Sequence, residues 1–202
     1  MTQLAPVLAP RDLPLAELHA ARLDGELYAV AGCFSPVDTA ETTVTRATAV
    51  RLTFGDRFIA EQRTAAWIWG VTDTPPAPHQ LCTDARIRTR VPNPPNTAVR
   101  EAVLDDSEVV VIAGARVTGL IRTVTDLARL SPDFASAEAS IVRALMARGR
   151  FSLDECARAL DSRRNLPLKK IAWRRLLRVH DLTTPQPDDQ CLVTSDQPEL
   201  TR

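Results

Sequence analysis

The sequence predicts an α+β protein: a reduced winged-helix module, followed by a small mixed α/β domain that ends in a helical bundle. Three observations predict it. A short amphipathic helix and a glycine-containing hairpin open the chain, β-branched segments gather in its middle, and four helical patterns follow one another after residue 118. The expected domains are residues 1–41, residues 42–180 and an acidic, disordered tail at residues 181–202.

The N-terminal module is expected to be one helix and one hairpin. Residues 13–23 place leucines among alanines at near-helical spacing, and Asp24-Gly25 ends that pattern. The apolar residues of 27–34, with Gly32 among them, favour a short extended hairpin instead of a continued helix. The module therefore has the order helix and then wing.

Helical spacing returns after the hairpin. Residues 42–54 and 62–69 each predict a helix, and an apolar link at 58–60 joins them. The expected buried stripe of the first of these helices is Val44, Ala47, Val50 and Phe54. Trp67 and Trp69, on the second helix, are expected to pack in the core, although two tryptophans at this spacing can also stack on nucleic-acid bases.

Proline-rich runs and β-branched residues predict a small sheet in the middle of the chain. Residues 74–78 and 92–96 contain too many prolines for a helix or a central strand, so they are loops around a short strand near residues 80–83. The following segments are expected to be strands: residues 97–103, 109–112 and 115–117.

The C-terminal part is predicted to be helical. Four segments have helical spacing, and Ser152 with Glu155 forms a capping box at the start of the third. The predicted helices are residues 119–130, 135–147, 153–162 and 168–179. After His180 the chain is polar, acidic and rich in proline, which is typical of a disordered tail.

Composition narrows the class of protein. The chain has 25 basic and 25 acidic residues, so it lacks the overall positive field that steers many nucleic-acid-binding proteins, and any such binding must be local. Its four scattered cysteines predict buried, reduced thiols rather than a zinc site or disulfide framework. With no signal peptide and no long apolar run, the expected location is the cytoplasm, without membrane contact.

The sequence contains no recognisable set of catalytic residues. Phosphate-binding loops, nucleophile elbows and metalloprotease motifs are absent, and His19, His79 and His180 lie in different segments. No catalytic residue, metal or cofactor is therefore expected. Asp105, Asp106 and Glu108 can hold a hard divalent cation, which keeps a metal-dependent hydrolase or nuclease as a low-weight alternative, but a solvated turn explains them more simply.

The strongest charge signal lies near the end of the predicted fold. Residues 143–178 contain eleven basic residues against three acidic ones, whereas residues 1–41 contain two against six. The basic segment predicts either salt-dependent contact with nucleic-acid phosphates or solvated helix faces, and both interpretations stay open. The candidate nucleic-acid contacts are Arg22, Arg163, Arg164, Lys169, Lys170, Arg174, Arg175 and Arg178.

Three stretches, residues 25–36, 59–71 and 115–130, together resemble the AbiEi-like antitoxin family of bacterial type IV toxin–antitoxin systems. In the most specific of them, a strand ending Val-Thr leads into Arg-Thr and then Asp-Leu-Ala-Arg. The matching positions are Val117, Thr118, Arg122, Thr123, Asp126, Leu127, Ala128 and Arg129.

The resemblance implies a winged-helix module, an antitoxin domain, and repression of the protein's own operon. It also implies opposition to a nucleotidyltransferase-like toxin, without a need for physical contact. The first forty residues are too few for a complete winged helix. The motif residues are expected to have a structural role. Thr118 is the expected N-cap of the helix, and Arg122 is expected to pair with Asp126 one turn later. Thr123 and Arg129 belong to the same structural motif.

The function predicted from these observations is that of an antitoxin-like, DNA-binding transcriptional regulator. Its expected partner is the DNA of its own operator. The alternative is a protein-interaction module of the same fold that does not bind DNA.

Overall fold

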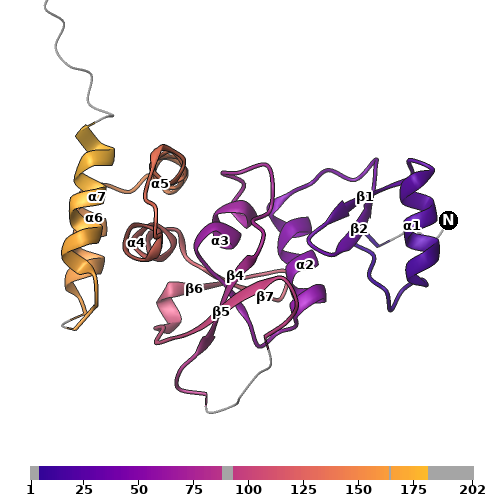
Figure 1. The fold of residues 1–202 in the computed structure, drawn as a ribbon, viewed down its shortest axis with the longest axis horizontal. Coiled ribbons are helices and arrows are strands. Elements are labelled where there is room, and N and C mark those ends of the chain that lie inside the picture. The colour runs from indigo at the N-terminus through magenta and orange to yellow at the C-terminus, as the bar shows by residue number, and fades with distance from the viewer. Residues whose placement is uncertain (1–4, 88–92, 164, 182–202) are drawn as a thin grey trace, which may run out of the picture.

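The computed structural model describes residues 5–87, 93–163 and 165–181, and within these ranges it confirms the α+β class. Figure 1 shows the arrangement: a two-stranded hairpin with one helix at one end, a five-stranded mixed sheet in the middle, and packed helices at the other end. The described part of the chain forms seven α-helices.

The N-terminal segment folds into the predicted helix and hairpin. Helix α1 (Leu15–Leu23) precedes strands β1 (Leu27–Val30) and β2 (Cys33–Pro36), which pair antiparallel. The turn between the strands has positive φ at Ala31 (44°) and Gly32 (82°), the geometry of a tight hairpin turn. A Cβ at Gly32 would lie 3.0 Å from the Thr53 side chain, so both the positive φ and the lack of space favour glycine at this position.

Helices α2 (Thr43–Phe54) and α3 (Gln62–Ile68) form where expected, and two details differ from the prediction. Val44 is 54% exposed because it lies in the first turn of α2, on the side away from the core, so the predicted stripe is wrong at that position. The apolar link between the helices is strand β3 (Ile59–Ala60), which is fully buried.

The sheet has the strand order β5-β4-β3-β7-β6. Strand β4 runs antiparallel to β3 and parallel to β5, while β7 runs parallel to β3 and antiparallel to β6. The two-residue strand β3 is therefore the centre of the sheet. The other strands are β4 (His79–Asp84), β5 (Thr97–Ala102), β6 (Val109–Ile112) and β7 (Ala115–Thr118), with a 3-10 turn at Asp106–Glu108 before β6.

Four helices complete the fold: α4 (Leu120–Leu130), α5 (Ser136–Gly149), α6 (Leu153–Asp161) and α7 (Lys169–Asp181). The predicted capping box at the start of α6 is confirmed, with the Ser152 hydroxyl accepting from the backbone of Glu155. Helix α4 contacts α3 on one side and α5, α6 and α7 on the other, so it joins the sheet to the terminal helices.

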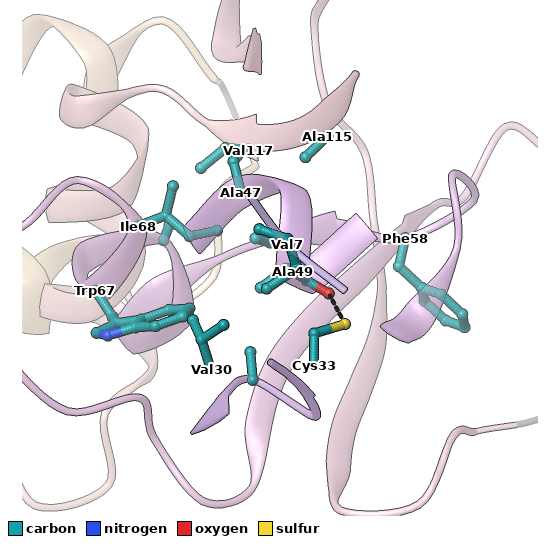
Figure 2. Close-up of a cluster of buried hydrophobic side chains, with 14 of the residues drawn as sticks. Val7, Val30, Cys33, Ala47, Ala49, Phe58, Trp67, Ile68, Ala115 and Val117 are labelled. Atoms are coloured by element: carbon teal, nitrogen blue, oxygen red, sulfur yellow. Dashed lines mark hydrogen bonds between the residues drawn. The ribbon is translucent and has the colours of Figure 1, made fainter. Parts of the chain in front are cut away.

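Two large clusters of buried apolar side chains hold these elements together. The first contains Val7 and Val30 together with Ala47, Trp67 and Val117, and Figure 2 shows these side chains meeting from the segment before α1, the hairpin, the helices and the sheet. The second cluster lies among α4 to α7. Residues of the predicted N-terminal module thus share one core with the sheet, while the domain boundary at residue 41 stays a prediction.

The remaining expectations about the chain concern thiols, membrane segments and the tail. Cys33, Cys82 and Cys156 are buried and free, and Cys33 donates to the carbonyl oxygen of Ala49 (3.7 Å; Figure 2). Cys191 lies outside the described residues. No helix in the described ranges has the length and hydropathy to cross a bilayer. Of the predicted tail, residue 181 belongs to α7 and residues 182–202 lie outside the described residues.

Candidate functional site

Asp126 of α4 lies at the centre of a cluster of arginines. Its carboxylate is fully buried and accepts hydrogen bonds from Nε of Arg122 (2.8 Å), Nη1 of Arg129 (2.8 Å) and Nη2 of Arg100 (2.9 Å). The expected pair between Arg122 and Asp126 therefore forms. Arg100 comes from β5, so the cluster also ties the sheet to α4.

The cluster continues at both ends through further carboxylates. Glu61, which follows β3 and is 1% exposed, accepts from Nε of Arg100 (2.7 Å). Glu108 accepts from Nη1 of Arg122 (2.9 Å) and from Arg163. We call these seven residues the arginine–carboxylate network: Glu61, Arg100, Glu108, Arg122, Asp126, Arg129 and Arg163.

The arginines of the network differ in how fully their charge is compensated. Burial acts to lower the pKa of Arg100 and Arg122, but the neighbouring carboxylates outweigh it and raise both values. For Arg129 burial again acts most strongly, and Asp126 is opposed by the positive charges of Arg122 and Arg100, so the pKa of Arg129 is lowered. The positive charge of Arg129 is thus the least compensated of the three.

The two motif threonines hold the junction between β7 and α4. Thr118 is not the helix N-cap, as the motif analysis expected, because its backbone still pairs with β6 and Gly119 occupies the cap position. Its buried hydroxyl instead shares a 2.8 Å hydrogen bond with the Thr123 hydroxyl, which also lies 2.9 Å from the carbonyl oxygen of Gly119. The motif residues of α4 thus fix how the helix leaves the sheet.

Two cavities adjoin the network, and we call them the arginine cavities. The first, of about 420 Å³, lies between α4, α6 and the 3-10 turn, and the second, of about 540 Å³, lies beside the end of β5. Arg122, Arg129, Arg163 and Leu166 line both of them. The structure therefore places three arginines at the walls of adjoining hollows.

Three of the predicted nucleic-acid contacts share one face of α7. Lys170, Arg174 and Arg178 are exposed and follow one another at four-residue intervals, while Ala172 and Leu176 are buried on the opposite side. Within the described residues, the one side-chain hydrogen bond of these three cations is internal to α7, from Nε of Arg174 to the carbonyl oxygen of Lys170 (3.5 Å). We call these three residues the α7 basic face.

Two other predicted contacts are held by carboxylates. Arg163 donates to the carbonyl oxygen of Val103 (2.7 Å) and pairs with Glu108 and, at 3.4 Å, with Asp105. Lys169 pairs with Asp161 at the end of α6. These side chains are half-buried and do not extend the α7 basic face.

The last three predicted contacts have different surroundings again. Arg175 donates to the carbonyl oxygens of Ala128 (3.0 Å) and Ser131 (2.9 Å), so it closes the C-terminal end of α4. Arg22 is exposed on α1, which Figure 1 shows at the opposite end of the molecule from α7. Arg164 lies outside the described residues. The structure thus separates Arg22 from the α7 basic face.

The carboxylates considered for a metal site are engaged with arginines instead. Glu108 binds two guanidinium groups, and Asp105 lies near Arg163. In the described ranges no group of three histidine, cysteine, aspartate or glutamate side chains has an arrangement that could hold a metal ion. Glu108 is therefore better placed to position arginines than to bind a cation.

Sequence reasoning missed Glu61 and Arg100. Arg100 lies within the strand pattern of residues 97–103, on the same side of the strand as Ala102, which is buried. The sequence signal that could have found Arg100 is a charged residue on the buried side of a predicted strand, because a charged side chain in that position needs a partner. Glu61 gave no comparable signal, since it lies between a two-residue strand and a helix.

A pH effect is expected at Asp84, at the end of β4. Hydrogen bonds from Arg86 lower the pKa of Asp84 to about 2. A depressed carboxyl pKa stabilises the fold above the unfolded value of about 4, and this contribution is lost as the pH falls through about 2. Asp84→Asn should therefore flatten the dependence of the denaturant midpoint on pH between these values, as followed by circular dichroism. An unchanged pH profile would contradict the assignment.

The comparisons with known proteins give a likeness to solved structures and none to a protein family. No protein family model matches the chain, and no curated protein matches it. A solved structure that is similar is that of the RV2827C protein from Mycobacterium tuberculosis, with 15% sequence identity and a TM-score of 0.43. The match covers 88% of this chain and 72% of that one.

Proposed function

We propose that the protein is an antitoxin-like DNA-binding regulator that contacts DNA phosphates through the α7 basic face. The observation that carries the proposal is the row of three exposed cations, Lys170, Arg174 and Arg178, on one helix face. With a rise of about 1.5 Å per residue, the three positions span roughly 12 Å of α7, which is comparable to the width of the major groove. Such a row can follow a DNA backbone.

The proposal draws further support from the sequence of residues 115–130. Their resemblance to the AbiEi-like antitoxins suggests binding to the protein's own operator and functional opposition to a nucleotidyltransferase-like toxin. In the structure this segment contributes Arg122, Asp126 and Arg129 to the network, and its helix α4 packs against α7. On this view the motif acts by holding the DNA-contacting helix in place.

The experiment is a gel shift with the DNA upstream of the gene, repeated at several salt concentrations. The test variant is K170Q/R174Q/R178Q, and the matched control is R143Q/R148Q/R150Q, which removes three exposed arginines associated with α5. The test variant should bind at least about ten-fold more weakly at low salt, with a salt dependence shallower by up to about three ions. The control should bind nearly as tightly as the natural protein.

Two results would remove the proposal. One is the absence of any shift by folded protein at low salt. The other is an equal loss of affinity in both triple variants, because binding would then follow overall charge and not the α7 basic face.

A protein-interaction function is the second candidate, and the surface of α7 favours it. Leu168 (47% exposed), Ile171 (37%) and Leu177 (36%) present apolar surface at or beside the basic residues. A cavity of about 520 Å³ between α6 and α7 is lined by Trp173. For this candidate, purified protein should form a stoichiometric complex with a toxin encoded beside its gene, and Leu177→Ala, which removes apolar surface without changing charge, should weaken that complex without changing the DNA shift.

A further inference from the structure

Strand β6 forms an open edge of the five-stranded sheet. In the described ranges it pairs with β7 on one side, and its other side is the end of the strand order. All four of its residues, Val109–Ile112, are β-branched and apolar, and Val111 is 67% exposed. Natural proteins usually protect such an edge with charged residues or proline. The opposite edge, β5, carries Arg100 and Glu101, whereas the sequence of β6 contains neither kind of protection.

The backbone groups of Val111 point away from β7. The amide of Gly119 donates to the carbonyl oxygen of Glu108 (2.8 Å), so Glu108 belongs to a hydrogen-bonded pair of the β6–β7 ladder. Such pairs alternate along an antiparallel ladder, which makes Val110 and Ile112 the next residues bonded to β7. The N–H and C=O groups of Val111 therefore lie on the outer edge, where another strand can pair with them.

A second copy of β6 fits this edge about a two-fold axis at Val111. When two β6 strands run antiparallel, Val111 of each copy can donate to and accept from Val111 of the other. The carbonyl oxygen of Val109 then faces the N–H of Ala113 in the other copy. The same register sets the 3-10 turn of one copy, Asp106–Glu108, beside the hairpin turn of the other, Ala113-Gly114.

The charges at the two ends of this edge are complementary in that register. Asp106 is fully exposed, and Arg86 approaches it only to 3.8 Å. Beside the hairpin turn lies Arg51, whose Cδ would be 3.2 Å from a Cβ at Gly114. In the described part of the chain, the buried Nε of Arg51 has no hydrogen-bond acceptor, and Nη1 lies 3.5 Å from the exposed Asp56. Each copy therefore brings an exposed carboxylate to an arginine of the other.

We propose that the protein forms a symmetric dimer through β6, in which the five-stranded sheets of two copies join into one continuous sheet with Val111 on the two-fold axis. Strands of four residues give a smaller contact than that of a permanent dimer, so the dissociation constant is expected to be roughly 10–100 µM. The dimer contact contains no residue of the α7 basic face, and the proposal does not depend on DNA binding.

Sedimentation velocity of the purified protein, from about 5 to 500 µM, tests the proposal. The natural protein should shift from monomer to dimer over this range. Val111→Lys places two ammonium groups opposite each other on the axis and should weaken the dimer at least about ten-fold. Val37→Lys is the matched control, because Val37 is similarly exposed (60%) and follows β2, outside the sheet. It should leave the association unchanged.

Two further variants test the register and the backbone contact. Val111→Pro removes the outward N–H but no bond to β7, so it should also weaken the dimer while the fold persists in circular dichroism. Val111→Cys should form a disulfide between two copies under mild oxidation, because residues opposite each other in a bonded pair have Cα atoms about 5.5 Å apart. Val37→Cys should not form this covalent dimer.

Several outcomes would overturn the dimer. These are a folded natural protein that stays monomeric up to about 500 µM, equal effects of Val111→Lys and Val37→Lys, or equal cross-linking of the two cysteine variants. Growth beyond a dimer would exclude a closed two-fold contact. The α7 triple variant should dimerise like the natural protein, so failure of the DNA-binding proposal and failure of this one can be told apart.

Discussion

Asp126→Ala is expected to lower the free energy of unfolding by about 3–5 kcal/mol, because a buried charge cluster loses the partner that its members share. Arg122 and Arg129 are 6% and 5% exposed, so neither guanidinium can turn to water without disturbing α4. Urea denaturation followed by circular dichroism measures the loss. Asp126→Asn retains the shape but not the charge, and should also be clearly destabilised.

The matched control for this experiment is Asp56→Ala. Asp56 also pairs with an arginine, Arg51, at 3.5 Å, but its side chain is 76% exposed. An exposed pair of this kind contributes less than about 1 kcal/mol. If the two alanine variants were equally stable, the network around Asp126 would have no greater role in stability than a surface ion pair.

Trp67→Ala is the second substitution with a large expected effect, a loss of about 3–5 kcal/mol. The Trp67 side chain is fully buried in the first core cluster, and the guanidinium carbon of Arg46 lies 5.1 Å from the ring centroid. Figure 2 shows Trp67 beside Val30 of the hairpin and near Ile68 of its own helix. Its removal leaves a cavity where the hairpin, α2 and α3 meet, and thermal unfolding with matched urea titrations measures the result.

Two other variants make this prediction specific. Trp67→Phe should cost much less than alanine, because it retains an aromatic ring and removes an indole N–H that has no acceptor within the described residues. Trp173→Ala removes a half-exposed tryptophan on α7 and should also be milder. A Trp67→Ala protein as stable as Trp173→Ala would show that the first cluster does not depend on this ring.

Local signals in the sequence predicted the helices and missed the centre of the sheet. Helix α6 begins at its capping box, and α4 follows apolar spacing over about three turns, so short segments carry enough information. Strand β3 has only two residues, Ile59 and Ala60. It is a strand because β4 and β7 pair with it, and β7 comes more than fifty residues later.

The same distinction applies to the candidate site. The pair between Arg122 and Asp126 was predictable because both residues lie one turn apart on the same helix. Arg100 reaches Asp126 from another element, which no spacing along the chain reveals. A count of basic residues also cannot distinguish Arg174, which is exposed, from its neighbour Arg175, whose guanidinium donates hydrogen bonds to backbone carbonyls at the end of α4.

The position of β3 has a consequence for synthesis on the ribosome. Until Ala115–Thr118 has left the exit tunnel, one edge of Ile59–Ala60 has no strand to pair with, although β4 can already cover the other. An unpaired apolar edge invites association between nascent chains. Arrest of translation before residue 115 should therefore yield aggregation-prone nascent chains, and emergence of residues 115–118 from the tunnel should end that vulnerability.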